Sequence, residues 1–123
     1  MKPRGFTLVE LLVVLSVLAV MAAISLPGFY AFSAQISLNA SAKTMASSLR
    51  KLQGQAILQH ETLTFNLTDL KLPKGISPIK TSNICFAPSG FTPPGGSGTF
   101  IIKNNIGQTK MIVVSTSGRV RVE

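Results

Sequence analysis

The chain has little of the chemistry that enzymes and metal sites use. Its 123 residues include one cysteine, one histidine and four acidic residues. The single Cys85 excludes an intramolecular disulfide and a metal site built from several cysteines. The lone His60 has no companion Cys, His or clustered carboxylate in the sequence, and the carboxylates form no acid/base pair. We therefore expect no enzyme activity, no metal and no cofactor.

Acidic residues are scarce, whereas basic residues are not. Twelve Lys and Arg against four Asp and Glu give a net charge of +8. This excess permits association with nucleic acid or anionic surfaces, although it indicates general attraction rather than a specific partner. Arg50 and Lys51 are interpreted as a solvated helix face or as partners for acidic residues of a neighbouring chain. The length supports one modest domain at most.

Charge is nearly absent from the segment that follows a short basic head. Residues 6–26 are long enough for a membrane-spanning helix, which needs about 20 apolar residues. The run exceeds the apolar core of about 7 to 15 residues in a cleaved secretory signal. Lys2 and Arg4 place the N-terminus on the cytoplasmic side. The run contains four polar residues: Thr7, Glu10, Ser16 and Ser25.

Pro27 and Gly28 would end an ordinary helix, but helical periodicity continues beyond them. We therefore predict one kinked helix from about residue 6 to about residue 58. Its second half stands outside the membrane, and the C-terminal residues must cover its apolar stripe. The stripe consists of Leu38, Ala42, Met45, Leu49, Leu52 and Ala56.

After Leu58 the apolar periodicity changes to two, which is typical of strands. The expected strands are residues 62–67, 99–103, 110–115 and 119–123, separated by turn residues at 72–75, 88–98, 104–107 and 116–118. The prediction is an α+β fold in which a long, kinked N-terminal helix packs against a small antiparallel sheet of four or five strands. We expect a meander, with 88–98 as a loop.

Glu10 is the unusual residue of the apolar run. A carboxylate in lipid costs about 2.5 to 3.5 kcal/mol at the helix centre and usually has a partner. Cleavage between Gly5 and Phe6 would create an α-amino group one helical turn from Glu10, on its own or a neighbouring chain. Alternatively, Glu10 lies at the headgroup boundary of a simple, unprocessed membrane anchor and is solvated.

The stretch KPRGFTLVELLVVLSVLAVMAAISLPGFY, residues 2–30, resembles the class III signal and N-terminal helix of type IV prepilins and pseudopilins. Gly5 before Phe6, Glu10 five residues into the mature chain, and Pro27 stand where that family has them. The resemblance implies cleavage by a prepilin peptidase after Gly5, N-methylation of Phe6, and packing of the apolar helices into a filament core. It also implies that Glu10 pairs with the amine of a neighbouring subunit during assembly.

The C-terminal part resembles the GspH/FimT domain through SSLRKLQGQAILQHETLTFNL, LPKGI, ICFAPSG and MIVVSTSGRVR. In that domain a helix end leads into a β-meander that closes on a Gly-Arg strand. The resulting organisation is a leader peptide at 1–5, a transmembrane and filament-core helix at 6–28, the outer half of the helix at 29–60, and a GspH/FimT-like β domain at 61–123.

The motif GRVR occupies residues 118–121, near the C-terminal end of the sequence. Arg119 and Arg121 alternate with valines, so both guanidinium groups leave one face of a strand while the valines face the core. Lys110 and Lys103 extend this patch toward phosphate oxygens if their strands neighbour the last one. Some FimT-like minor pilins carry a Gly-Arg-x-Arg ending linked to DNA capture. The alternative is a turn glycine followed by a solvated strand start.

Together these features predict a minor pilin or pseudopilin subunit of a type IV pilus or related filament, with DNA capture by the C-terminal basic strand as an additional activity. The alternatives are a minor pseudopilin of a type II secretion system and a DNA-uptake (competence) pilin. Expected partners are other pilin or pseudopilin subunits, the prepilin peptidase, the inner membrane and DNA. The chain is expected to cross the inner membrane once, with a cytoplasmic N-terminus, before joining a periplasmic or extracellular filament.

Overall fold

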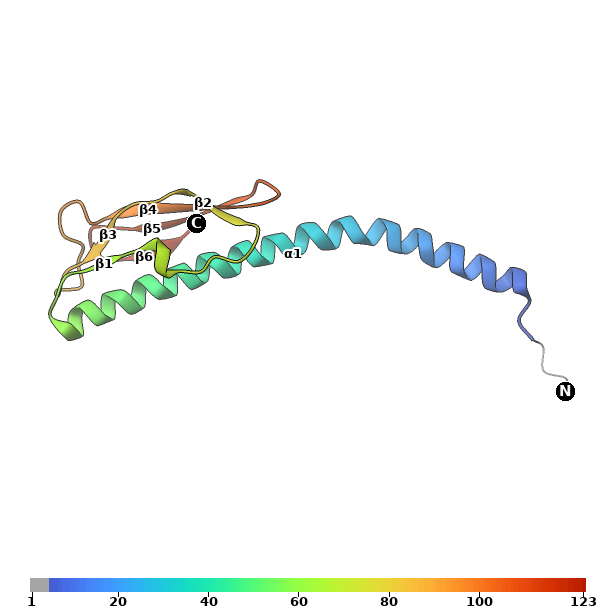
Figure 1. The fold of residues 1–123 in the computed structure, drawn as a ribbon, viewed down its shortest axis with the longest axis horizontal. Helices are drawn as coiled ribbons and strands as arrows, with labels where there is room; N and C mark the ends of the chain where they lie inside the picture. Colours follow the sequence, from blue (N-terminus) through green and yellow to red (C-terminus); the bar gives the residue numbers. More distant parts are fainter. Residues whose placement is uncertain (1–4) are drawn as a thin grey trace. The chain divides into compact units, whose positions relative to one another are not determined.

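The computed structural model describes residues 5–123, which contain one long helix followed by short antiparallel strands (Figure 1). The chain divides into two compact units, Met1–Ser33 and Ala34–Glu123. The predicted α+β class is confirmed. Of the leader expected at residues 1–5, only Gly5 lies among the described residues. The elements are α1 (Leu8–Gln59), β1 (Leu63–Phe65), a 3-10 turn (Leu67–Asp69), β2 (Ile76–Lys80), β3 (Ile84–Phe86), β4 (Gly98–Asn104), β5 (Thr109–Val114) and β6 (Val120–Val122).

Helix α1 continues through Pro27, so the prediction that the helix resumes beyond this residue is confirmed. It is long and apolar enough to cross a membrane. Every described residue up to Ser33 is exposed. This apolar surface has no cover within its own unit, as is typical of a segment that lies in lipid or against the helices of other chains.

The end of α1 is fixed by a backbone motif. His60 has a φ of 55°, in the left-handed region, and the Glu61 N–H donates to the Ala56 carbonyl oxygen at 3.3 Å. This six-to-one bond is the Schellman arrangement, in which the residue after the helix is usually glycine. The backbone of His60 therefore caps the C-terminus of α1.

Replacing His60 by glycine is expected to raise the free energy of unfolding by up to about 1 kcal/mol, because glycine adopts a positive φ without steric cost. Urea unfolding of residues 28–123, followed by circular dichroism, measures the change. Gln59→Gly, one residue earlier and still inside α1, is the control and should destabilise. A loss of stability in His60→Gly contradicts the assigned cap.

The strands form two sheets rather than one. The larger sheet has the order β2-β4-β5-β6, and β1 pairs with β3 in a separate two-stranded sheet. The predicted meander is confirmed for β4, β5 and β6, which are antiparallel neighbours in sequence order. The expectation of a single meander is wrong for β2, which pairs with β4, and for β3, which returns to β1. Segment 88–98 is a loop up to the start of β4, as predicted.

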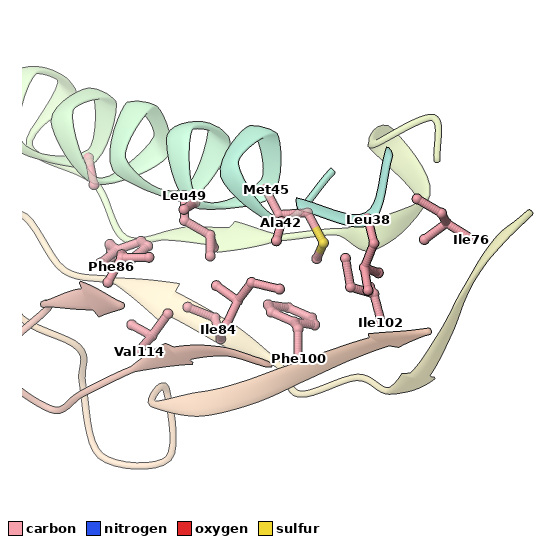
Figure 2. Packing of buried hydrophobic residues seen from close by; sticks show 14 residues of the cluster. Leu38, Ala42, Met45, Leu49, Ile76, Ile84, Phe86, Phe100, Ile102 and Val114 are labelled. Atoms are coloured by element: carbon pink, nitrogen blue, oxygen red, sulfur yellow. The ribbon is translucent and has the colours of Figure 1, made fainter. Parts of the chain in front are cut away.

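The core lies between α1 and the sheets (Figure 2). The predicted stripe is buried at every position except Leu52, which is half-buried and packs against the same cluster. Phe100 of β4 is 1 % exposed, and its ring meets Phe65 edge to face at 5.4 Å between centroids. Within residues 5–123, the buried apolar residues all lie from Leu38 to Val120. A fragment of residues 28–123 therefore keeps the complete core, and we expect it to fold without the apolar span.

Gln53 ties α1 to two distant segments. Its side-chain amide donates to the Gly90 carbonyl oxygen at 2.6 Å and to the Gly118 carbonyl oxygen at 3.1 Å. Thr92, in the same loop as Gly90, donates its hydroxyl to the Thr116 carbonyl oxygen at 3.1 Å. The loop before β4 and the turn before β6 are therefore held against the helix, and this arrangement positions the C-terminal strand.

Candidate functional site

The bond between Gly5 and Phe6 lies in an exposed segment just before α1. Neither residue belongs to a helix or strand, and Phe6 is 76 % exposed. No atom lies within 4 Å of the position that a Gly5 side chain would occupy. Proteases cut accessible backbone outside regular structure most readily. The geometry is therefore compatible with the predicted cleavage between Gly5 and Phe6.

Glu10 occupies the first turn of α1, where its carboxylate complements the partial positive charge of the helix N-terminus. The Thr7 hydroxyl oxygen accepts the Glu10 N–H at 3.3 Å, and the Thr7 carbonyl oxygen accepts the Leu11 N–H at 3.2 Å. Thr7 is thus the N-cap, and the spacing Thr-x-x-Glu is that of a capping box. Sequence analysis missed the role of Thr7, although this spacing was a readable signal.

The carboxylate of Glu10 has no basic partner among residues 5–123. Within residues 5–123 the recorded ion pair is Arg121 with Glu123, at the opposite end of the sequence. Glu10 is also the one charged residue between Phe6 and Lys43. A cation for this carboxylate must therefore come from the chain's own N-terminus, from lipid, or from another chain.

Arg119 and Arg121 lie on either side of the buried Val120. The Ser115 N–H donates to the Arg119 carbonyl oxygen at 3.0 Å, and Arg121 lies opposite Val113 in the β5–β6 pair. Val120 is 6 % exposed and faces the core, so the alternation of a strand turns both arginines to the other face. Val122 lies opposite the buried Ile112, on the same face as Val120, but near the chain end its side chain is 38 % exposed.

The predicted patch of four cations is not assembled on one face. Lys110 lies opposite Ile102, on the face that carries the buried Ile112, and is half-buried. Lys103 shares the outer face with Arg121, but its strand is separated from β6 by β5. Lys103 was expected to extend the patch only if its strand neighboured the last strand, and it does not. Lys110 meets that condition but lies on the opposite face of the sheet.

Two contacts that sequence analysis missed define the surroundings of β6. The Arg50 Nη2 atom donates to the Val120 carbonyl oxygen at 3.4 Å, which brings a third guanidinium group to the strand. We call Arg50, Arg119 and Arg121 the arginine cluster. Glu123 lies 4.0 Å from Arg121, with both side chains more than half exposed, so the pair is weak but lowers the local positive charge. The Arg50 contact joins segments 70 residues apart, whose proximity the sequence pattern did not indicate.

Cys85 lies in β3 and is half-buried. Its sulfur is 3.4 Å from the Thr64 hydroxyl oxygen across the β1–β3 pair. Among residues 5–123, no group of three or more His, Cys, Asp and Glu side chains is placed to hold a metal ion. Cys85 therefore belongs to the packing between the two short strands.

Residues 1–26 match the family model of the prokaryotic N-terminal methylation motif. No curated protein and no solved structure matches the chain. The matched motif is the type IV prepilin signal, and it contains Gly5, Phe6 and Glu10. It supports a type IV pilin-like protein that is processed by a prepilin peptidase and assembles with other pilin subunits. Together with the apolar helix, it fits a subunit anchored in the inner membrane, with a structural rather than an enzymatic role.

Proposed function

We propose that this chain is a minor pilin or pseudopilin subunit that is cleaved between Gly5 and Phe6, N-methylated on Phe6, and assembled into a type IV pilus or related filament. The observation that carries the proposal is the matched motif at residues 1–26, placed on an exposed apolar helix that leads into a compact α+β unit. Filaments of this class need both parts. The helix supplies the shared core and the outer unit supplies specific contacts.

Charge explains why cleavage and assembly are coupled. Cleavage removes Lys2 and Arg4 with the leader and creates one amine on Phe6, which N-methylation leaves positively charged. The Glu10 carboxylate has no cation within the described chain, so a neighbouring subunit's amine can neutralise it inside the apolar core. The same pairing fixes the axial position of one helix against the next, because both charges are costly unless they meet.

The GspH/FimT subfamily is proposed from the C-terminal part. Strand β6, which directly follows Arg119, closes the meander, and the loop before β4 is held by hydrogen bonds from Gln53 and Thr92. A lone Cys85 cannot form the C-terminal disulfide loop of many major pilins. A minor pseudopilin of a type II secretion system has the same architecture. Co-purification with secretion-system or pilus subunits from cells distinguishes the two machines.

The assembly role is tested with Glu10→Gln, which keeps a side chain suited to the capping box but loses the charge. We expect the variant to be processed normally, with a mature chain that begins at methylated Phe6, and to be depleted from sheared filaments. Without the Glu10 carboxylate, the amine of the neighbouring subunit is left as an unpaired charge in the apolar core. This costs about 2.5 to 3.5 kcal/mol, which lowers the equilibrium constant for incorporation by roughly 100-fold. Intact-mass spectrometry and immunoblots of the filament fraction give the two readouts.

Glu61→Gln removes one carboxylate from the outer unit and serves as the matched control, which should enter filaments like the wild type. Equal incorporation of Glu10→Gln and wild type contradicts the pairing. A wild-type chain that stays unmodified from Met1 to Glu123 in cells expressing the peptidase contradicts processing itself. The chain would then be a simple membrane anchor.

DNA capture is a second candidate function, favoured by the arginine cluster. The Arg50 guanidinium donates to the Val120 carbonyl oxygen, and the residues on either side of Val120, Arg119 and Arg121, are exposed. Guanidinium groups bind phosphate oxygens in bidentate geometry, which suits a nucleic-acid backbone. This supports a competence pilin, with Lys103 and Lys110 outside the cluster.

The DNA hypothesis is tested by titrating duplex DNA against residues 28–123 at several salt concentrations. Arg119→Ala with Arg121→Ala is expected to weaken binding and to lower the slope of log affinity against log salt by about 2, because each phosphate contact contributes about 0.9. Lys43→Ala with Lys51→Ala removes the same charge from α1 and is the control. Equal losses in both variants, or no binding by the wild type, contradict a site at the arginine cluster.

A further inference from the structure

The end of unit Ala34–Glu123 at which α1 enters is strongly basic. Leu38 is the first buried residue of this unit, and it packs near Ile76 and Ile102 (Figure 2). The loop before β2 and the hairpin between β4 and β5 lie at this end, and the hairpin extends beyond the other strands (Figure 1). These two segments carry four lysines, which we call the proximal lysines: Lys71, Lys74, Lys103 and Lys110.

Local contacts place Lys71, Lys74 and Lys103 at the same end of the unit. The segment around Lys71 lines a groove with the α1 residues Ser37, Ala40, Ser41 and Thr44. Gly75, which follows Lys74, lies against the Asn105 side chain at the hairpin tip. The Lys103 side chain extends along the hairpin toward Gly107. The loop and the hairpin therefore present their cations at one end of the unit.

The proximal lysines have no acidic neighbour at ion-pair distance within residues 5–123. Glu123 is paired with Arg121, Glu61 follows the far end of α1, and Asp69 lines a groove with Ser48 and Gln55, further along the helix. Three of the lysines are exposed. At the tip of the hairpin Ile106 is 44 % exposed, so an apolar side chain accompanies the charges.

The membrane-spanning segment ends close to this basic end along the chain. Ala34 lies eight positions after Leu26, which is about 12 Å at the helical rise. That tether length holds at any angle between the two units. The connecting residues include exposed Phe29 and Phe32, aromatic residues of the kind that gather at headgroup level. The tether therefore keeps the unit's entry end within about 12 Å of the end of the apolar span, close to the Debye length of about 8 to 10 Å over which exposed charges attract.

We propose that the proximal lysines bind the phosphate groups of anionic phospholipids and dock unit Ala34–Glu123 on the membrane that holds the apolar span. Lysine suits this partner because a flexible ammonium group follows mobile headgroups, whereas its apolar stem and Ile106 lie against the lipid boundary. The proposal rests on the membrane-anchored state of the proposed pilin-like subunit, not on its incorporation into a filament. Extraction into a filament must then break this contact.

The test uses the full chain in nanodiscs, either phosphatidylcholine alone or phosphatidylcholine mixed with phosphatidylglycerol. A fluorophore on Ile106→Cys, in a Cys85→Ser background, reports quenching by lipids spin-labelled near the headgroup. We expect quenching in the anionic discs, and its loss in zwitterionic discs or at about 1 M salt, where the Debye length is roughly 3 Å. A fluorophore on Phe91→Cys, in the loop that Gln53 holds at the far part of α1, should not be quenched.

Charge-matched variants identify the lysines. Lys71→Gln, Lys74→Gln and Lys103→Gln together should abolish the quenching at position 106. The control, Lys43→Gln, Lys51→Gln and Lys80→Gln, removes the same charge elsewhere and should retain it. Equal loss in both triple variants, or quenching that is indifferent to phosphatidylglycerol, overturns the proposal.

Two further outcomes are separable from these. Duplex DNA that binds the same three lysines, with no effect of lipid composition, overturns the proposal in favour of nucleic acid. A chain that does not enter nanodiscs at all overturns the membrane anchor, and with it the proposed function. Normal insertion without quenching overturns the docking alone.

Discussion

Replacing Gly118 by alanine is expected to lower the free energy of unfolding of residues 28–123 by about 2 to 5 kcal/mol. Part of the loss arises because alanine is strained in the left-handed backbone conformation, and part because its side chain overpacks the site. Gly118 has a φ of 76°, and its N–H donates to the Ser115 carbonyl oxygen at 2.9 Å. A side chain there would overlap the Gly90 carbonyl and the Gln53 amide. The overlap falls on the joint that holds the last strand against α1.

Gly95→Ala is the matched control for this prediction. Gly95 also has a positive φ, 83°, but no atom lies within 4 Å of its Cβ position. The Gly95→Ala variant should lose only the free energy that the left-handed backbone conformation costs an alanine, about 1 to 2 kcal/mol. Urea unfolding followed by circular dichroism compares the two variants. Equal losses would show that the contact with Gly90 and Gln53 does not constrain the turn.

The structural role of Gly118 limits what the GRVR motif indicates about DNA binding. Gly118 is required by the turn whether or not the protein binds nucleic acid. Loss of DNA binding in a Gly118 variant would therefore follow from a displaced strand. The functional question depends on Arg119 and Arg121, whose side chains are exposed and can be removed without touching the joint.

The sequence was most informative where the signal was local and repeated. The stripe from Leu38 to Ala56 recurs at helical spacing, so α1 and its buried face could be predicted beyond Pro27. Strands β4, β5 and β6 follow dense β-branched alternation between turn residues. The processing segment is contiguous, which is why Gly5, Phe6 and Glu10 could be named from sequence and fall within the matched motif.

The sequence was least informative where contacts join distant segments. Strand β2 carries Pro78 and pairs irregularly at the sheet edge, and β3 is only three residues long, so neither has a usable period. The contact between Arg50 and Val120 spans 70 residues. The face on which Lys110 lies was predictable in part, because Lys110 and Ile112 are two residues apart in a strand and so lie on the same face. The strand order that separates Lys103 from β6 was not.

Phe100→Ala is expected to cost about 3 to 5 kcal/mol, because a large buried ring leaves a cavity that its neighbours fill only partly. Phe100 lies in the middle of the core and contacts Phe65 edge to face. Phe91→Ala is the control, because its ring is 56 % exposed and should change stability by no more than about 0.5 kcal/mol. Urea unfolding of residues 28–123 gives both values, and similar losses in the two variants contradict the assigned core.

The same pair of variants separates folding from processing in cells. The motif at residues 1–26 and the Phe100 core belong to different units of the chain. Domains of this size are stable by only about 5 to 15 kcal/mol, so Phe100→Ala removes a large share of that stability. We expect Phe100→Ala to be cleaved and methylated at Phe6 as in the wild type, but to be less abundant and depleted from filaments, whereas Phe91→Ala behaves normally. Intact-mass spectrometry reports the processing. An unprocessed Phe100→Ala chain would show that the peptidase requires the folded outer unit, because accessibility of the Gly5–Phe6 bond alone would then be insufficient.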